Sequence, residues 1–236
     1  MKKGKLYLIP SPIAKDGHNN TAPPQVIESI RHIQHFLVED IRTARRFLSS
    51  LKIFESIESL RFSKLDKNTN ASELDSMMQP LLDGLDVGVL SEAGCPGIAD
   101  PGSLAVQYAH EQQFQVVPLV GPSSIILALM ASGLNGQQFA FHGYLPIDTK
   151  EFDTRIQRLE QESSRRKQTQ MFIETPYRNQ QLAERLFRRL DPSTRLCIAL
   201  DLTGPDEMVK TQRIEAWRAH GISLPKLPCL FLFLAN

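Results

Sequence analysis

Residues Val87–Ser103 read VGVLSEAGCPGIADPGS, and this stretch decides the fold class. Its first four residues, VGVL, are apolar and include two β-branched valines, which is typical of a buried strand. Gly94, Gly97 and Gly102, with two prolines among them, prevent a strand or a helix from continuing. The stretch therefore predicts a strand that runs into a tight loop, whose backbone can approach a ligand closely.

The loop leads into a helix predicted over Leu104–Gln112, and Pro101 stands where prolines favour helix starts. A strand, a glycine-rich loop and a helix in this order are the unit of an α/β sheet, in which ligands bind at the carboxyl ends of the strands. The spacing alone leaves two interpretations open, a ligand-binding loop and a sharp turn without a ligand.

The rest of the chain alternates strands and helices in the same way, so the fold class predicted is α/β. Further strands are predicted over residues 5–9, 36–38, 115–119, 138–146, 170–174, 195–200 and 228–234, with an irregular strand over 53–62. Further helices are predicted over residues 25–34, 41–52 capped by Asp40, 72–82 capped by Ser72, 123–132, 150–168, 176–190 and 212–219.

The strongly charged helix over 150–168 begins a second alternation. We therefore predict an N-terminal α/β domain over residues 1–140, which carries the cofactor loops, and a C-terminal α/β domain over residues 141–236. The chain has 236 residues, of which 42% are apolar and 22% charged, which is typical of a soluble globular protein. The formal net charge of +1 excludes a strong overall field that would attract nucleic acid.

Cysteine usage and the chain ends predict the compartment. Three cysteines lie far apart, too few for a disulfide framework or a CxxC metal site, so a reducing, cytoplasmic setting without a bound metal is expected. The apolar run before Pro10 is shorter than the roughly 7–15 residues of an export signal. The final CLFLFLAN is shorter than the roughly 20 residues that span a bilayer. No membrane association is therefore expected.

A second candidate ligand loop follows the strand predicted over 115–119. It reads VGPSS, and its backbone amides and the hydroxyls of Ser123 and Ser124 precede a helix. Amides at a helix N-terminus can bind a carboxylate or a hydroxylated sugar. The alternative is that Ser123 is only the cap of that helix.

Six blocks of sequence, taken together, carry a resemblance. LYLIPSPI, VEDIRTARRFL, VGVLSEAGCPGIADPGS, VVPLVGPSSIILALMASGL, FHGYLP and MFIETPYR follow one another in the order and spacing of the tetrapyrrole methylase superfamily. Within it the chain most resembles the ribosomal RNA small subunit methyltransferase I family, over most of residues 5–203. That family methylates a ribose 2′-hydroxyl of 16S rRNA with S-adenosyl-L-methionine.

The resemblance implies two α/β domains of the tetrapyrrole methylase type with the cofactor cleft between them, a homodimer, and ribosomal RNA or the small ribosomal subunit as partner. The positions that match the family's cofactor contacts are Pro10, Ser11, Ile13, Gly94, Cys95, Pro96, Ile98, Ser123, Ser124, Ile125, Glu174, Thr175, Leu202, Thr203 and Pro228. Backbone amides, hydroxyls and apolar walls are what a methionyl group, a ribose and an adenine require.

The chain also departs from the family pattern. Ile41 replaces a threonine after the acidic pair Glu39 and Asp40, and Asp201 and Gly204 stand where the family has an acid and a lysine. Longer members carry a small region beyond the position of Asn236. These departures keep two alternatives open: a methyltransferase acting on a tetrapyrrole or other small molecule, and a non-catalytic S-adenosylmethionine-binding module.

Methylation of a hydroxyl requires a group that accepts its proton. Glu92 and Asp100 flank the glycine-rich loop and are the predicted catalytic residues; Glu39, Asp40 and Glu174 are further candidates. Each of them could instead organise a turn or form an ion pair, and His142 is predicted to be structural. The helices predicted over 150–168 and 176–190 carry basic residues that either bind RNA phosphates or only form a solvated face. These residues are Arg155, Arg158, Arg165, Arg166, Lys167, Arg185, Arg188 and Arg189.

Overall fold

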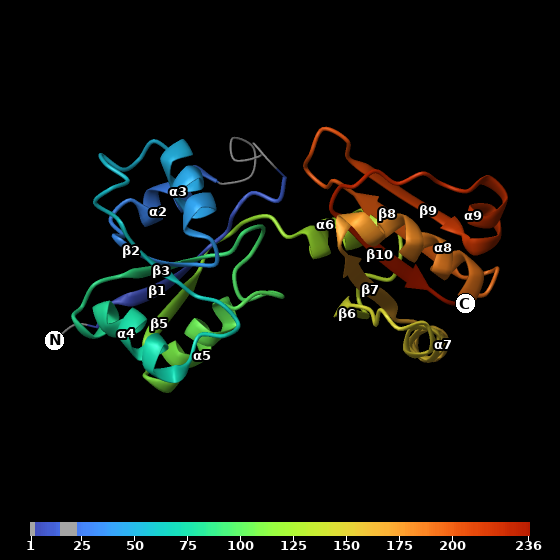
Figure 1. Cartoon of the computed structure of the whole chain (residues 1–236), viewed down its shortest axis with the longest axis horizontal. Coiled ribbons are helices and arrows are strands. Elements are labelled where there is room, and N and C mark those ends of the chain that lie inside the picture. Colours follow the sequence, from blue (N-terminus) through green and yellow to red (C-terminus); the bar gives the residue numbers. More distant parts are fainter. Residues whose placement is uncertain (1–2, 15–22) are drawn as a thin grey trace. The chain divides into compact units, whose positions relative to one another are not determined.

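The computed structural model describes residues 3–14 and 23–236. The chain forms two compact units, Met1–Ser123 and Ser124–Asn236. Each unit is built on one five-stranded sheet with helices packed against it, as the ribbon shows (Figure 1). The predicted organisation into two α/β domains is confirmed.

The sheet of the first unit has the strand order β3-β2-β4-β1-β5, and every pairing in it is parallel. Its strands are β1 (Lys5–Ile9), β2 (His35–Val38), β3 (Arg61–Lys64), β4 (Val87–Leu90) and β5 (Gln115–Pro118). All four residues of β4 are buried, as expected of a strand near the middle of a parallel sheet. Since all strands point the same way, their carboxyl ends meet at one edge.

Helices cover both faces of this sheet. They are α2 (Pro24–Ile30), α3 (Ile41–Ser50), α4 (Ala71–Leu82) and α5 (Gly102–Glu111). One core joins α2 and α3 to the sheet through Ile30, Leu48 and Ile9, and another joins α4 and α5 through Met78, Ala105 and Leu6. The first unit is therefore a doubly wound α/β domain.

Two local predictions in the first unit are corrected. The prediction of an irregular strand over 53–62 is wrong, because residues 53–60 form turns and bends and the paired strand begins only at Arg61. Helix α4 is capped by Asn70 instead of Ser72: the Asn70 side chain accepts the Glu73 N–H, and the Glu73 carboxylate accepts the Asn70 N–H, each at 3.0 Å. The predicted cap of α3 is confirmed, since Asp40 Oδ1 accepts the Thr43 N–H at 2.7 Å.

The second unit has a mixed sheet of order β6-β7-β10-β8-β9, in which only the β6–β7 pair is parallel. Its elements are α6 (Ser124–Ser132), β6 (Phe139–Tyr144), α7 (Thr149–Arg166), β7 (Thr169–Glu174), η1 (Pro176–Arg178), α8 (Asn179–Arg189), β8 (Arg195–Leu200), β9 (Met208–Arg213), α9 (Ile214–His220) and β10 (Cys229–Leu234). Trp217, Phe172 and Phe231, all fully buried, belong to its main core.

The second unit differs from its predicted outline in two places. The helix expected over 212–219 begins only at Ile214, because the polar stretch MVKTQR before it forms the edge strand β9 against β8. Helix α6 packs on the second sheet, where Ala128 and Leu129 meet Met171 and Leu230. The two compact units consequently divide after Ser123, earlier than the boundary predicted after residue 140.

Within the described part of the chain, no helix has the length and apolar character required to cross a bilayer.

Candidate functional site

Three loops meet at the carboxyl edge of the first sheet, after β1, β4 and β5. The Ser11 N–H donates to the Gly94 carbonyl at 2.9 Å, and the Gly94 N–H returns a bond to the Ser11 carbonyl at 3.0 Å. The Ser11 hydroxyl donates to the Ser91 carbonyl at 2.8 Å. The loop after β1 and the glycine-rich loop after β4 are thus joined by backbone pairing.

The loop after β5 is held against both of the others. A Cβ atom at Gly121 would lie 2.1 Å from Cβ of Pro10, so only a glycine allows this approach. The Cys95 thiol donates to the Pro122 carbonyl at 3.3 Å. Both candidate ligand loops and the loop with Pro10 and Ser11 therefore come together in one unit.

Asp100 organises the glycine-rich loop from behind. Its Oδ1 accepts the N–H groups of Gly97, at 2.5 Å, and Gly102, at 2.8 Å. The loop needs such support because Ala99, which is not a glycine, has a φ of 60°. Burial raises the pKa of Asp100, and the two amide bonds act in the opposite direction. Asp100 does not line the cavity described below, so its contacts are those of a loop-organising group.

Replacing Asp100 with alanine is expected to lower the free energy of unfolding by about 1 kcal/mol, since two N–H groups lose their acceptor in a half-buried loop. Asp100→Asn is the matched control, because an amide oxygen can still accept both bonds without the cost of burying a charge. Urea unfolding of both variants checks this, and equal stability of the alanine and asparagine variants would contradict it.

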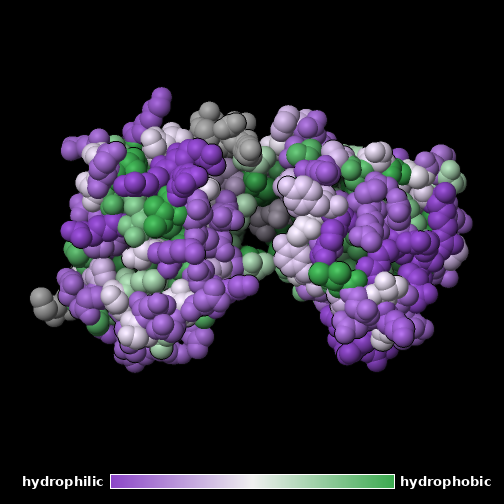
Figure 2. Space-filling view, viewed as in Figure 1, coloured by the Kyte–Doolittle hydropathy of each residue, from purple (hydrophilic) through white to green (hydrophobic). Residues whose placement is uncertain are grey.

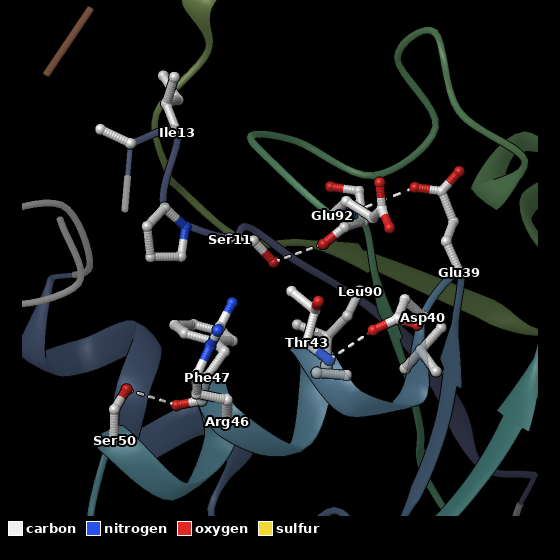
Figure 3. A pocket seen from close by; sticks show the side chains of 15 residues that line it. Ser11, Ile13, Glu39, Asp40, Thr43, Arg46, Phe47, Ser50, Leu90 and Glu92 are labelled. Atoms are coloured by element: carbon white, nitrogen blue, oxygen red, sulfur yellow. Dashed lines mark hydrogen bonds between the residues drawn. The ribbon is translucent and has the colours of Figure 1, made fainter. Parts of the chain in front are cut away.

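A cavity of about 410 Å³ opens beside the joined loops, between them and α3 (Figure 3). It is lined by Ser11, Pro12, Ile13, Ala14, Val38, Glu39, Asp40, Thr43, Ala44, Arg46, Phe47, Ser50, Leu90, Ser91 and Glu92. Of the predicted cofactor residues, only Ser11 and Ile13 line it. Four lining residues from α3 were not predicted as site residues: Thr43, Arg46, Phe47 and Ser50. The sequence feature that could have indicated them is a helix that is rich in arginine, contains no acid and directly follows the acidic pair Glu39 and Asp40.

Glu39 is the half-buried carboxylate of this cavity. It extends from the end of β2 toward Glu92, whose N–H donates to Glu39 Oε2 at 3.2 Å (Figure 3). Burial raises the pKa of Glu39, the Glu92 amide lowers it, and the charges of Asp100 and Glu92 raise it further. A carboxylate with a raised pKa accepts a proton more readily than a solvated one. Asp40, in contrast, is committed to capping α3.

The predicted site residues of the second unit lie along one edge of its own sheet. Cys229 pairs with Glu174 of β7 and with Leu200 of β8, so the ends of these two strands meet the start of β10. Thr175, Leu202, Thr203 and Pro228 follow or precede these three strand ends. Thr203 has a φ of 68°, and its buried hydroxyl has no hydrogen-bond partner among the described residues. Ser124 and Ile125 open α6.

Glu174 is occupied by structural contacts. Its Oε1 accepts the Thr175 N–H and the Arg178 guanidinium, each at 2.6 Å. The side chain is 7% exposed, and the ion pair with Arg178 compensates the burial of its charge. These contacts match the ion pair, which was one of the interpretations of Glu174.

The departures at Asp201 and Gly204 are structurally linked. Asp201 has a φ of 46°, and its Oδ2 accepts the Asp206 N–H at 3.0 Å. A Cβ atom at residue 204 would lie 2.1 Å from that same oxygen. Because the Asp201 carboxylate holds the turn between β8 and β9 in this way, position 204 has no space for the side chain of a lysine.

His142 is held as a neutral imidazole. The Arg155 guanidinium can only donate, so its 3.2 Å contact makes Nδ1 the acceptor; Nε2 then carries the proton and donates to Gln170 Oε1 at 2.7 Å. Burial lowers the pKa of His142, and the charge of Arg155 lowers it further, against the effects of Gln170 and Glu162. This arrangement agrees with the structural role predicted for His142.

Since the folded state lowers the pKa of His142, protonation favours the unfolded chain. The stability contributed by neutral His142 is present above the ordinary histidine pKa of about 6.5 and is lost as the pH falls through the lower folded value. Unfolding free energies measured from pH 7.5 to 5 should therefore decline more steeply for the natural chain than for His142→Gln. Parallel curves would contradict this assignment.

Several basic residues predicted as phosphate contacts are engaged within the second unit. Arg166 pairs with Glu162 at 3.3 Å, and Arg189 pairs with Asp153 at 2.8 Å. The Arg185 guanidinium lies 3.7 Å from the Phe152 ring centroid. No group of three or more histidine, cysteine or acidic residues that could hold a metal ion occurs among the residues described.

The two sheets and the loops at their edges give the chain the fold of known methyltransferases. It superposes on the crystal structure of the methyltransferase CobJ with a TM-score of 0.63, at 15% identity, over 99% of this chain and all of the other. Uroporphyrin-III-C-methyltransferase from Thermus thermophilus gives a TM-score of 0.55 at 18% identity, over 98% and 92% of the two chains. A family model described as Tetrapyrrole (Corrin/Porphyrin) Methylases matches residues 17–216. The chain belongs to the tetrapyrrole methylase family, and so to a family of methyltransferases, as the resemblance predicted.

Three curated relatives share one name, Ribosomal RNA small subunit methyltransferase I. The protein of that name from Vibrio cholerae is 29% identical over 87% of this chain and 67% of its own length. That from Halalkalibacterium halodurans is 32% identical over 75% and 57%, and that from Escherichia coli O157:H7 is 28% identical over 85% and 66%. The chain thus spans between 57% and 67% of the length of these three relatives.

Proposed function

We propose that this chain is an S-adenosyl-L-methionine-dependent methyltransferase that methylates a ribose 2′-hydroxyl of ribosomal RNA in the small subunit. The observation that carries the proposal is the match to relatives named for small-subunit rRNA methylation, over 75–87% of this chain in the three cases above. The resemblance to the same family also supports a homodimer as the working form.

The residues proposed to hold the cofactor occupy one strand edge in each unit. In the first unit the glycine-rich loop and the loop after β5 offer backbone amides and carbonyls that suit a methionyl carboxylate and ammonium. In the second unit the unpartnered hydroxyl of Thr203 offers a polar group that suits a nucleoside. The sulfonium of the bound cofactor supplies a methyl group that is already activated for transfer.

The chain itself must position the acceptor, exclude water and remove one proton. We propose Glu39 as the group that accepts the proton of the 2′-hydroxyl, since it lines the cavity and burial raises its pKa. Glu92 orients Glu39 through its backbone N–H. Asp100 acts only through the loop that it supports. Among the predicted catalytic residues, the proposal therefore retains Glu92 beside the base and moves Asp100 to a positioning role.

A transfer assay with radiolabelled S-adenosyl-L-methionine tests this function. Small ribosomal subunits from cells that lack the protein are offered in one arm and a tetrapyrrole in the other. Label that maps to a ribose 2′-oxygen is the expected result. Label in the tetrapyrrole alone would overturn the RNA assignment, and calorimetric binding of the cofactor without label in either arm would indicate a non-catalytic binding module.

A further inference from the structure

Helix α3 presents an arginine face next to the cavity that contains Glu39, the proposed base. Arg42, Arg45 and Arg46 are all exposed, and the ten residues of α3 contain no acid. The space-filling view shows hydrophilic residues gathered over this helix (Figure 2). This face places three positive charges within two turns of one helix.

These three arginines have no ion-pair partner among the described residues, in contrast to Arg166 and Arg189 of the second unit. Asp40 is occupied by the Thr43 N–H. The Arg45 guanidinium lies 5.6 Å from the centroid of the Phe62 ring. In addition to the hydrogen bond from the Ser56 hydroxyl, its charge helps to lower the pKa of Glu58, which is fully exposed.

The arginine face connects two hollows. Arg46 lines the cavity that contains Glu39, and the close-up view shows its side chain directed toward that cavity (Figure 3). Arg46 and Arg45 also line an open groove of about 490 Å³ on the other side of the helix, together with Ser49, Phe54 and Glu58. The groove carries two acids, Glu55 and Glu58, and the Ser56 hydroxyl donates to Glu58.

A polynucleotide fits this arrangement better than a small acceptor does. A single nucleotide in the cavity requires one cationic contact at its rim, whereas a chain that continues along the helix places successive phosphates against successive arginines. Arginine binds phosphate with two parallel hydrogen bonds, and Phe54 and the serine hydroxyls offer contacts for a base or a ribose.

We propose that the Arg42–Arg45–Arg46 face of α3 is the docking surface for the RNA backbone that flanks the methylated nucleotide, with Arg46 nearest the cavity. The inference rests on the proposed function and adds to it the surface by which the substrate is held. It assigns RNA binding to the first unit, whereas the phosphate contacts predicted from the sequence lie on helices of the second.

The test measures binding of small ribosomal subunits to the full chain between 50 and 200 mM salt. The double variant Arg45→Gln/Arg46→Gln is expected to reduce the slope of log Kobs against log salt by about 0.7–0.9 for each arginine removed. It should also raise KM for subunits more than it lowers kcat. Arg31→Gln is the control on a different helix, since Arg31 carries the same charge at the C-terminal end of α2 and, among the described residues, forms its ion pair with Glu28. Calorimetric cofactor affinity should stay unchanged in all variants and serves as the check on folding.

The outcomes separate the docking surface from the function. If the natural chain labels subunits and the double variant keeps both its slope and its KM, the docking surface is overturned and the function stands. If the natural chain binds subunits without labelling them, and the salt dependence of binding falls in the double variant but not in Arg31→Gln, the function is overturned and the assignment of RNA binding to this face stands. Absence of any salt-dependent binding by the natural chain would overturn both.

Discussion

Glu39→Gln is expected to lower kcat for methyl transfer by about 10²–10⁴-fold, the usual contribution of a positioned general base. Glutamine keeps the shape of the side chain and can still accept the Glu92 N–H, so the cavity should not change. The loss should therefore appear in kcat, with the calorimetric affinity for S-adenosyl-L-methionine unchanged. Single-turnover transfer of label to small ribosomal subunits measures it.

The pH profile distinguishes a base from a purely orienting group. The proposed base must be ionised to accept a proton, and burial raises the pKa of Glu39, so kcat of the natural chain should fall as the pH drops through that raised value. In Glu39→Gln the residual rate should lose this limb. Glu92→Gln is the matched control: Glu92 is exposed and contributes its backbone N–H, which the substitution retains, so a loss well below tenfold is expected. A larger loss at Glu92 than at Glu39 would reverse the two roles.

The loops of the first unit were predictable because glycine and proline restrict what a backbone can do. Gly94 and Gly97 both adopt a positive φ, and the strand before them is buried on both faces, as the run VGVL indicates. What sequence could not provide is the distance between loops. The bond pair between Ser11 and Gly94 joins residues far apart in the chain, and nothing local signals it.

Two further features depend on tertiary packing. Strand β9 reads as polar and runs directly into a helix, so it is recognisable only through its register with β8. The role proposed for Glu39 depends on how far neighbouring elements bury its carboxylate. The adjacent Asp40 also carries a carboxylate, but that group caps α3. Periodicity distinguishes neither carboxylate from the other.

Gly121→Ala is expected to lower the free energy of unfolding by about 1–3 kcal/mol, as is typical of an overpacked site. The new Cβ would overlap the Pro10 ring, with Cβ at 2.1 Å and Cγ at 2.3 Å, and neither the ring nor the backbone can move without separating the loops after β1 and β5. Because both loops are proposed to bind the cofactor, the affinity for S-adenosyl-L-methionine should also fall by at least about tenfold, which corresponds to roughly 1.4 kcal/mol.

Gly136→Ala is the matched control for this variant. Gly136 also lies in a loop, but a Cβ atom added there would meet no atom of the described residues within 4 Å beyond its chain neighbours, and its φ is not in the left-handed region. Alanine there should be neutral or stabilising by up to about 1 kcal/mol, because it restricts the unfolded chain without a clash. Urea unfolding and calorimetry on both variants separate the cases. If Gly121→Ala matched Gly136→Ala in both measurements, the close approach of the two loops would have no energetic weight, and the cofactor would have to be held by other residues.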